Sequence, residues 1–114
     1  MKCVIAGGRT YHLTEDDRSF LDTLGIQEVV CGGAPGADEG GASWARARGI
    51  PVTYFRADWA THGKAAGPIR NEQMAKYADA AVLFPGGRGT ESMRSLALKH
   101  GVKLLTPSTC NGGQ

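Results

Sequence analysis

The sequence predicts an α/β fold: a three-layer, Rossmann-like parallel sheet of about five strands with helices on both faces. Short apolar segments alternate with amphipathic segments along the chain, which is typical of a parallel sheet covered on both sides. Glycine-rich turns follow the first, second and fourth apolar segments. The length of 114 residues is that of a single domain with a sizeable core.

The expected strands are short and apolar on both faces, as in a sheet that is buried on both sides. They comprise residues 4–6, 28–31, 52–55, 80–84 and 102–105. Right-handed crossovers place every helix start at the edge where the strands end. With the strand order 3-2-1-4-5, the turns at 7–9 and 86–90 meet at the switch point, where open α/β sheets bind ligands.

The helices between these strands have recognisable ends. Thr14 and Asp38 are expected to cap the first and second helices, because their side chains can accept hydrogen bonds from a helix start. Pro68 is expected to open the third helix after a long loop at 58–67. The last helix is expected to begin after Thr90. Its apolar face has the clearest period of the chain and comprises Met93, Leu96, Ala97 and His100.

We expect one domain over residues 1–106 and a flexible tail over 107–114. The formal net charge is only +2, and no dense run of Lys and Arg occurs, which counts against nucleic-acid binding. No apolar run is long enough to cross a membrane. The cysteines, Cys3, Cys31 and Cys110, are widely spaced and form no zinc motif. These features favour a cytoplasmic protein without a membrane segment, metal or cofactor.

Residues 85–90 (PGGRGT) run from a strand through a glycine turn into a helix, an arrangement that can bind phosphate. Glycines let backbone N–H groups approach an anion, and the positive end of the helix faces the same point. The segment is neither a P-loop nor a GxGxxG dinucleotide motif. The alternative is a turn that only joins strand to helix. The sequence therefore predicts a nucleotide or nucleotide-derived ligand.

Further residues are expected at the same edge. Arg70 is expected to clamp phosphate, and the alternative is a surface ion pair with Glu72. Asn71 is expected to hydrogen-bond a ribose hydroxyl or the helix start. Trp59 either stacks on a base or covers its own core. The complete set of expected ligand contacts is Gly7, Gly8, Arg9, Gly33, Arg70, Asn71, Pro85, Gly86, Gly87, Arg88, Gly89 and Thr90.

These motifs resemble those of a known superfamily. Residues 85–90 resemble the PGGxGT signature of the LOG (lysine decarboxylase-like, cytokinin-activating) phosphoribohydrolases, and residues 32–38 (GGAPGAD) resemble the glycine loop of the DNA-processing protein DprA. Both motifs are typical of the SLOG superfamily of Rossmann-like nucleotide binders. Residues 6–9 (AGGR) and 66–71 (AGPIRN) resemble most closely the small YspA-type SLOG family. The resemblance covers roughly residues 4–105.

The resemblance implies an activity whose residues are only partly present. In the LOG enzymes an arginine and a glutamate hydrolyse the N-glycosidic bond of a nucleoside 5′-monophosphate. Arg70 matches the arginine, but Met93 stands at the position of the glutamate. Losing such an electrostatic group typically costs ~10²–10³ in rate. Binding, with the protein sensing or sequestering a nucleotide, is therefore the leading hypothesis.

Two alternatives stay open. An N-glycosidic-bond hydrolase acting on a nucleoside monophosphate or an NAD-like compound would need a carboxylate from Glu91, Asp58 or Glu72. Arg70 and Glu91 are the candidate catalytic residues, although Glu91 is expected to point to another side of its helix. Single-stranded DNA binding, by analogy with DprA, is the third hypothesis, and the low net charge counts against it. The superfamily also suggests a homodimer, which no residue pattern indicates.

Overall fold

The computed structural model of the chain describes residues 1–106. It contains a five-stranded parallel sheet, which confirms the predicted fold class, and the strand order β3-β2-β1-β4-β5 is the one assumed above for the switch point. The strands are β1 (Lys2–Ala6), β2 (Glu28–Cys31), β3 (Val52–Tyr54), β4 (Ala80–Leu83) and β5 (Lys103–Leu105). The predicted bounds differ from these only at the strand ends. The expected tail at 107–114 lies outside the described residues.

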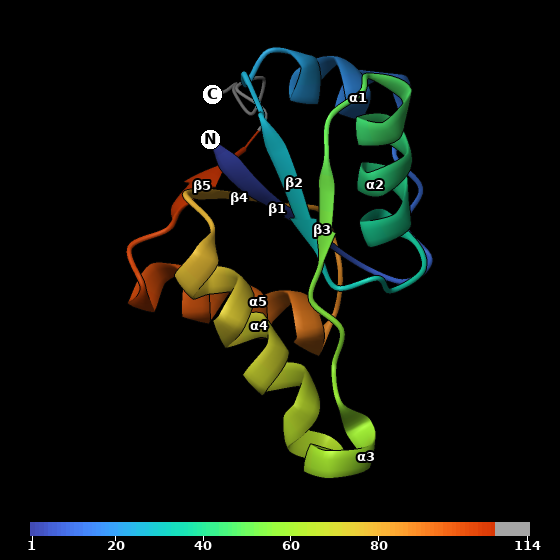
Figure 1. Cartoon of the computed structure of the whole chain (residues 1–114). Coiled ribbons are helices and arrows are strands. Elements are labelled where there is room, and N and C mark those ends of the chain that lie inside the picture. The colour runs from blue at the N-terminus through green and yellow to red at the C-terminus, as the bar shows by residue number, and fades with distance from the viewer. Residues whose placement is uncertain (107–114) are drawn as a thin grey trace.

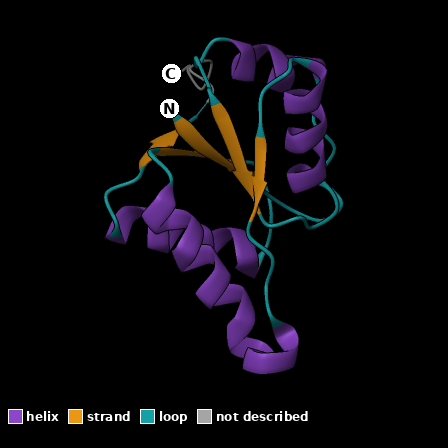
Figure 2. Ribbon diagram, in the orientation of Figure 1, coloured by secondary structure: helices purple, strands orange, loops and turns teal. Residues whose placement is uncertain are grey.

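Helices cover both faces of the sheet (Figures 1 and 2). Helices α1 (Glu15–Asp22) and α2 (Ala37–Ala47) cover one face, and α4 (Ala66–Tyr77) and α5 (Arg88–Lys99) cover the other. The short α3 (Trp59–His62) and the 3₁₀ turn η1 (Gly63–Ala65) precede α4. Within residues 1–106, none of the helices combines the length and apolar character that a membrane span requires.

Alternate residues of the central strand β1 point to the two faces of the sheet. Ile5 packs with Leu21 and Trp44 in the core beneath α1 and α2. Val4 packs with Met93 in the core beneath α4 and α5. All of these side chains are buried, and each fully buried apolar side chain contributes about 1.5–3 kcal/mol to stability. Because β1 contributes to both cores, the position of the turn after it is firmly fixed.

The predicted cap of α1 is confirmed, and the predicted cap of α2 is wrong. Thr14 and Asp17 form a capping box at the start of α1. Helix α2 begins two residues earlier than expected, and its N-cap is Gly36 with φ +81°. Only glycine fits there, because a Cβ would lie 2.3 Å from the carbonyl oxygen of Gly8. Asp38 therefore lies inside the first turn of α2, and its side chain turns back to the preceding loop.

The predicted long loop at 58–67 is also wrong, because α3, η1 and the start of α4 occupy it. Asp58 caps α3 by accepting a hydrogen bond from the backbone N–H of Thr61 (3.1 Å). Pro68 is consequently the third residue of α4 instead of the first. Proline is tolerated there, because the first four N–H groups of a helix have no intrahelical acceptor.

Gly41 sets the close approach of α2 to β1. A Cβ at this position would lie 2.5 Å from Cγ2 and 2.9 Å from Cβ of Ile5, which is fully buried and β-branched. We expect Gly41→Ala to lower the free energy of unfolding by about 1–3 kcal/mol in urea denaturation. Ser43→Ala, at an exposed position of the same helix, is the control and should change it by less than about 0.5 kcal/mol. Equal stabilities of the two variants would contradict this packing.

Candidate functional site

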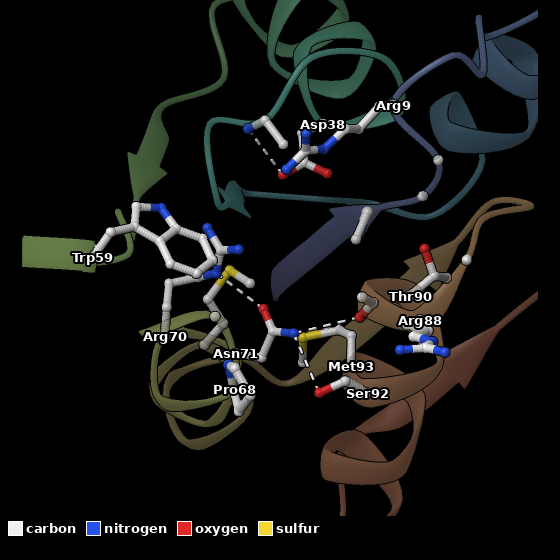
Figure 3. Close-up of a pocket in the computed structure, with 18 residues that line it drawn as sticks. Arg9, Asp38, Trp59, Pro68, Arg70, Asn71, Arg88, Thr90, Ser92 and Met93 are labelled. Carbon is white, nitrogen blue, oxygen red and sulfur yellow. Dashed lines mark hydrogen bonds between the residues drawn. The ribbon is translucent and has the colours of Figure 1, made fainter. Parts of the chain in front are cut away.

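A cavity of about 460 Å³ opens where β1 and β4 end side by side (Figure 3). Its wall comes from the turn after β1, the loop before α2, the start of α4 and the start of α5. The residues that line it include Gly7, Gly8, Arg9, Ala34, Asp38, Trp59, Arg70, Asn71, Gly87, Arg88, Gly89, Thr90 and Met93. The position is the topological switch point of the sheet, and the volume is within the roughly 300–1,000 Å³ typical of small-molecule sites.

Most of the predicted ligand residues are brought together around this cavity, but Gly33, Pro85 and Gly86 lie outside its wall. Gly33 has φ +79°, a turn conformation that favours glycine. The carbonyl oxygen of Pro85 accepts a hydrogen bond from the backbone N–H of Gly8 (2.8 Å). A Cβ at Gly86 would lie 2.6 Å from that same nitrogen and 2.2 Å from Oγ1 of Thr90. These residues shape the turns that surround the cavity.

Helix α5 begins at Arg88 and not after Thr90, which is buried within the first turn. Gly87 is its N-cap, and no side chain of the described residues caps it. Neither Gly87 nor Gly89 has a positive φ. Apart from its chain neighbours and the nearby backbone of its own helix, a Cβ on either would meet no atom of residues 1–106 within 4 Å. At Gly89, within the first turn of α5, neither crowding nor a positive φ requires glycine, and the open space lies beside the N–H groups of a helix start.

The charged side chains around the cavity are mostly cationic. Arg9, Arg70 and Arg88 line it, together with a single carboxylate among the described residues, that of Asp38. Arg9 lies on an exposed turn and Arg88 is the exposed first residue of α5, whereas Arg70 is half-buried. The whole chain has a formal charge of only +2, so this local excess of positive charge favours an anionic ligand.

Arg70 reaches the cavity as predicted, and the alternative ion pair with Glu72 is wrong. Its Nη1 donates to the carbonyl oxygens of Gly32 (3.0 Å) and Phe55 (3.4 Å), and its Nε donates to Oδ1 of Asn71 (2.9 Å). Glu72 instead contacts the C-terminal end of α5. Burial lowers the pKa of the Arg70 guanidinium, although an arginine stays charged at neutral pH. The hydrogen bonds hold this positive charge at the cavity wall.

Asn71 joins α4 to the start of α5. Its side chain is buried, and Nδ2 approaches the carbonyl oxygen of Gly89 (3.4 Å) and Oγ of Ser92 (3.5 Å) (Figure 3). These hydrogen bonds are long and therefore weak, but they give the Asn71 NH₂ group two acceptors on α5. Of its two predicted roles, the geometry supports contact with the helix start.

Asp38 lines the cavity, and the sequence interpretation missed this role. Its Oδ2 accepts hydrogen bonds from the backbone N–H groups of Gly32 (3.1 Å) and Ala34 (3.4 Å), and the residue is 6% exposed. Burial raises the pKa of the Asp38 carboxyl, while these N–H groups and the charge of Arg70 act to lower it. The sequence feature that could have indicated a place for Asp38 in the cavity wall is its position at a helix start beside a glycine turn. The same feature fits the capping role that the sequence analysis assigned.

The candidate catalytic pair of Arg70 and Glu91 is not assembled. Glu91 is exposed, lies outside the cavity wall and pairs with Arg94 (3.5 Å). Asp58 is used in capping α3. Met93 is 1% exposed and lines the cavity, as its place on the inward face of α5 predicts. A thioether can neither carry a proton to a leaving base nor balance a developing positive charge.

Trp59 lies at the rim of the cavity and does not cover its own core. The side chain is 56% exposed, and its Cη2 would lie 3.4 Å from a Cβ added at Gly67. Trp59 and Arg70 both line the cavity (Figure 3). An exposed aromatic ring at a cavity rim offers a stacking surface for a planar group.

Within residues 1–106, no group of three or more His, Cys, Asp or Glu side chains is arranged to hold a metal ion. Burial raises the pKa of Cys3 to about 12 and of Cys31 to about 11. Such thiols are protonated at neutral pH and unreactive.

The doubly covered parallel sheet and the cationic cavity at its switch point define a Rossmann-like α/β domain. A family model described as the YspA, cpYpsA-related SLOG family (YAcAr) matches residues 1–62. The Gene 61 protein of Mycobacterium phage D29 is 44% identical over 85 residues, which is 68% of each chain. The chain therefore belongs to the YspA, cpYpsA-related SLOG family, as its motifs predicted. Membership of this family suggests nucleotide-related ligand binding or a glycosidase-like activity.

The loop before α2 depends on the acceptor that Asp38 provides. We expect Asp38→Ala to lower the free energy of unfolding by roughly 1–3 kcal/mol, because two N–H groups lose their acceptor. Asp38→Asn keeps an amide oxygen for them and should lose less, as measured by urea denaturation at pH 7. Equal losses in the two variants would contradict the role of these hydrogen bonds.

The same Asn variant tests the pKa of Asp38. A carboxyl whose pKa is raised on folding stabilises the folded state fully below its unfolded pKa, and this contribution is lost as the pH rises through the folded pKa. Wild type should therefore lose stability relative to Asp38→Asn as the pH rises from about 3. A relative gain by wild type would show that the N–H groups and Arg70 outweigh burial.

Proposed function

We propose that the cavity binds a nucleotide or nucleotide-derived ligand, with its phosphate at the start of α5, and that the protein senses or sequesters this ligand. The supporting observation is the open space in front of Gly87 and Gly89. Glycine leaves the N–H groups there accessible, and the positive end of the helix dipole adds attraction for an anion. At Gly89, neither crowding nor a positive φ within the described structure explains the glycine.

The arginines support an anionic ligand. Arg88 lies at the start of α5, and Arg70 and Arg9 come from two other elements around the cavity. A guanidinium presents several N–H donors in a planar fork that matches phosphate geometry. Their convergence from separate parts of the chain favours one shared ligand over independent surface charges.

Trp59 supports a ligand with a planar base over inorganic phosphate alone. Its exposed indole lines the same cavity as the start of α5. Stacking of a base on an aromatic side chain contributes about 1–3 kcal/mol. A cavity with an anion-binding end and an aromatic rim matches the two chemical parts of a nucleotide.

The side chains favour binding over hydrolysis. Met93 occupies the position of the expected catalytic glutamate, and Glu91 points away from the cavity. Arg70 alone can hold a phosphate or polarise a sugar, but no carboxylate of α5 within residues 1–106 faces it. We therefore propose that the ligand leaves the site unchanged.

A thermal-shift series with nucleoside 5′-monophosphates, diphosphates and NAD tests binding. A ligand at about 100 times its Kd should add about 2.7 kcal/mol of stability. In Gly89→Ala the new methyl group fills the space beside the N–H groups, so the ligand-induced shift should disappear. The unliganded variant should be as stable as wild type or about 1 kcal/mol more stable, because alanine favours a helix. Ser95→Ala, at an exposed position of α5, is the control; a full shift in Gly89→Ala would contradict the proposed phosphate position.

Chromatography of the nucleotides after incubation separates binding from hydrolysis. We expect AMP, other monophosphates and NAD to be recovered intact. Release of free base by wild type that disappears in Arg70→Ala would instead establish an N-glycosidic-bond hydrolase.

A further inference from the structure

Asp38 has one carboxylate oxygen that the protein itself does not use. Both hydrogen bonds to this side chain within residues 1–106 end on Oδ2. Oδ1 is not sealed in the interior, because no side-chain oxygen of the described residues is both buried and without a partner. The residue is 6% exposed and lines the cavity, so the cavity offers a ligand a route to this carboxylate.

No cation of the described residues neutralises this oxygen at close range. None of the ion pairs within 4 Å among residues 1–106 includes Asp38. Arg70 acts on it only as a nearby charge, since its hydrogen bonds go to carbonyl and amide oxygens. A carboxylate accepts hydrogen bonds and cannot donate them, so a ligand group that meets Oδ1 has to be a donor.

The sheet places Asp38 and the start of α5 on opposite sides of the turn after β1. Strands β2 and β4 both pair with β1, and neighbouring strands are about 4.8 Å apart, so the ends of β2 and β4 are separated by about 10 Å. Asp38 follows β2, and Gly87 and Gly89 follow β4. A phosphate bound near the glycines avoids the negative carboxylate, which is left facing the neutral polar part of the ligand.

In a nucleotide, the part next to the phosphate is the sugar, whose hydroxyl groups are donors. We propose that Oδ1 of Asp38 accepts a hydrogen bond from a ribose hydroxyl, so that the site selects ribonucleotides over deoxyribonucleotides. This inference rests on the proposed nucleotide binding and adds its sugar specificity. The sugar then lies over Gly7 and Gly8, between Asp38 and the start of α5.

The purely structural alternative explains only half of the side chain. A single side-chain oxygen is enough to accept the hydrogen bonds from the N–H groups of Gly32 and Ala34. An asparagine or serine would provide such an oxygen without burying a charge. A buried carboxylate is costly unless its charge is used. The second oxygen, open to the cavity, is the part that a ligand explains.

Isothermal titration with adenosine, 2′-deoxyadenosine and 3′-deoxyadenosine 5′-monophosphates, and with the matching guanosine set, tests the proposal. A hydrogen bond to a charged group should make one deoxy ligand bind roughly ten- to hundredfold more weakly than the ribonucleotide. Asp38→Asn keeps an oxygen for the loop but presents an NH₂ group to the sugar. The discrimination should therefore fall at least about threefold in this variant.

Glu39→Gln is the matched control, because Glu39 is the adjacent carboxylate on α2, is exposed and pairs with Arg46 away from the cavity. It should leave the discrimination unchanged. Equal binding of ribo and deoxy ligands by wild type would overturn the role of Asp38 while leaving nucleotide binding intact. Discrimination that persists fully in Asp38→Asn would do the same. Failure of every nucleotide to bind would overturn the proposed function itself, and this inference with it.

Discussion

The close contact between the turns after β1 and β4 is the constraint on which the site depends. The backbone N–H of Gly8 donates to the carbonyl oxygen of Pro85 (2.8 Å). A Cβ at Gly86 or at Gly36 would strike the backbone of the turn after β1. Glycine at these positions allows three chain segments to meet without side chains between them. The cavity exists because this contact holds the start of α5 and the loop before α2 around one space.

The glycines therefore divide into two groups with different physical reasons. Gly36 and Gly86 are required by the protein's own packing, whereas Gly87 and Gly89 face open space. The first group shapes the turns around the cavity, and the second leaves the N–H groups of a helix start uncovered by side chains. A glycine-rich sequence alone cannot separate these groups, because both look the same until the neighbouring atoms are known.

The charged groups around the cavity come from separate elements and are held by the protein's own backbone. Arg70 is held at the wall by carbonyl oxygens, and the inward position on α5 is occupied by the apolar side chain of Met93. Asp38 provides a carboxylate from the opposite side, but its hydrogen bonds to backbone N–H groups fix it in the loop. Among the described residues, α5 therefore brings no carboxylate to the cavity wall.

The sequence by itself determined the fold class, the cap at Thr14 and the inward side of α5, because each depends on periodicity or on contacts within a few residues. The strand order could only be assumed, because it depends on pairing between strands that are far apart in the sequence. The tertiary structure decided the role of Asp38. The N–H groups that donate to its carboxylate belong to the loop before α2, and the path of this loop is set by its contact with the turn after β1. The tertiary structure also decided that Arg70 bonds to the ends of β2 and β3 rather than to Glu72. Short helices such as α3 escaped prediction because a single turn carries no period. Local signals specify the elements, and only their packing specifies which polar atoms remain free for a ligand.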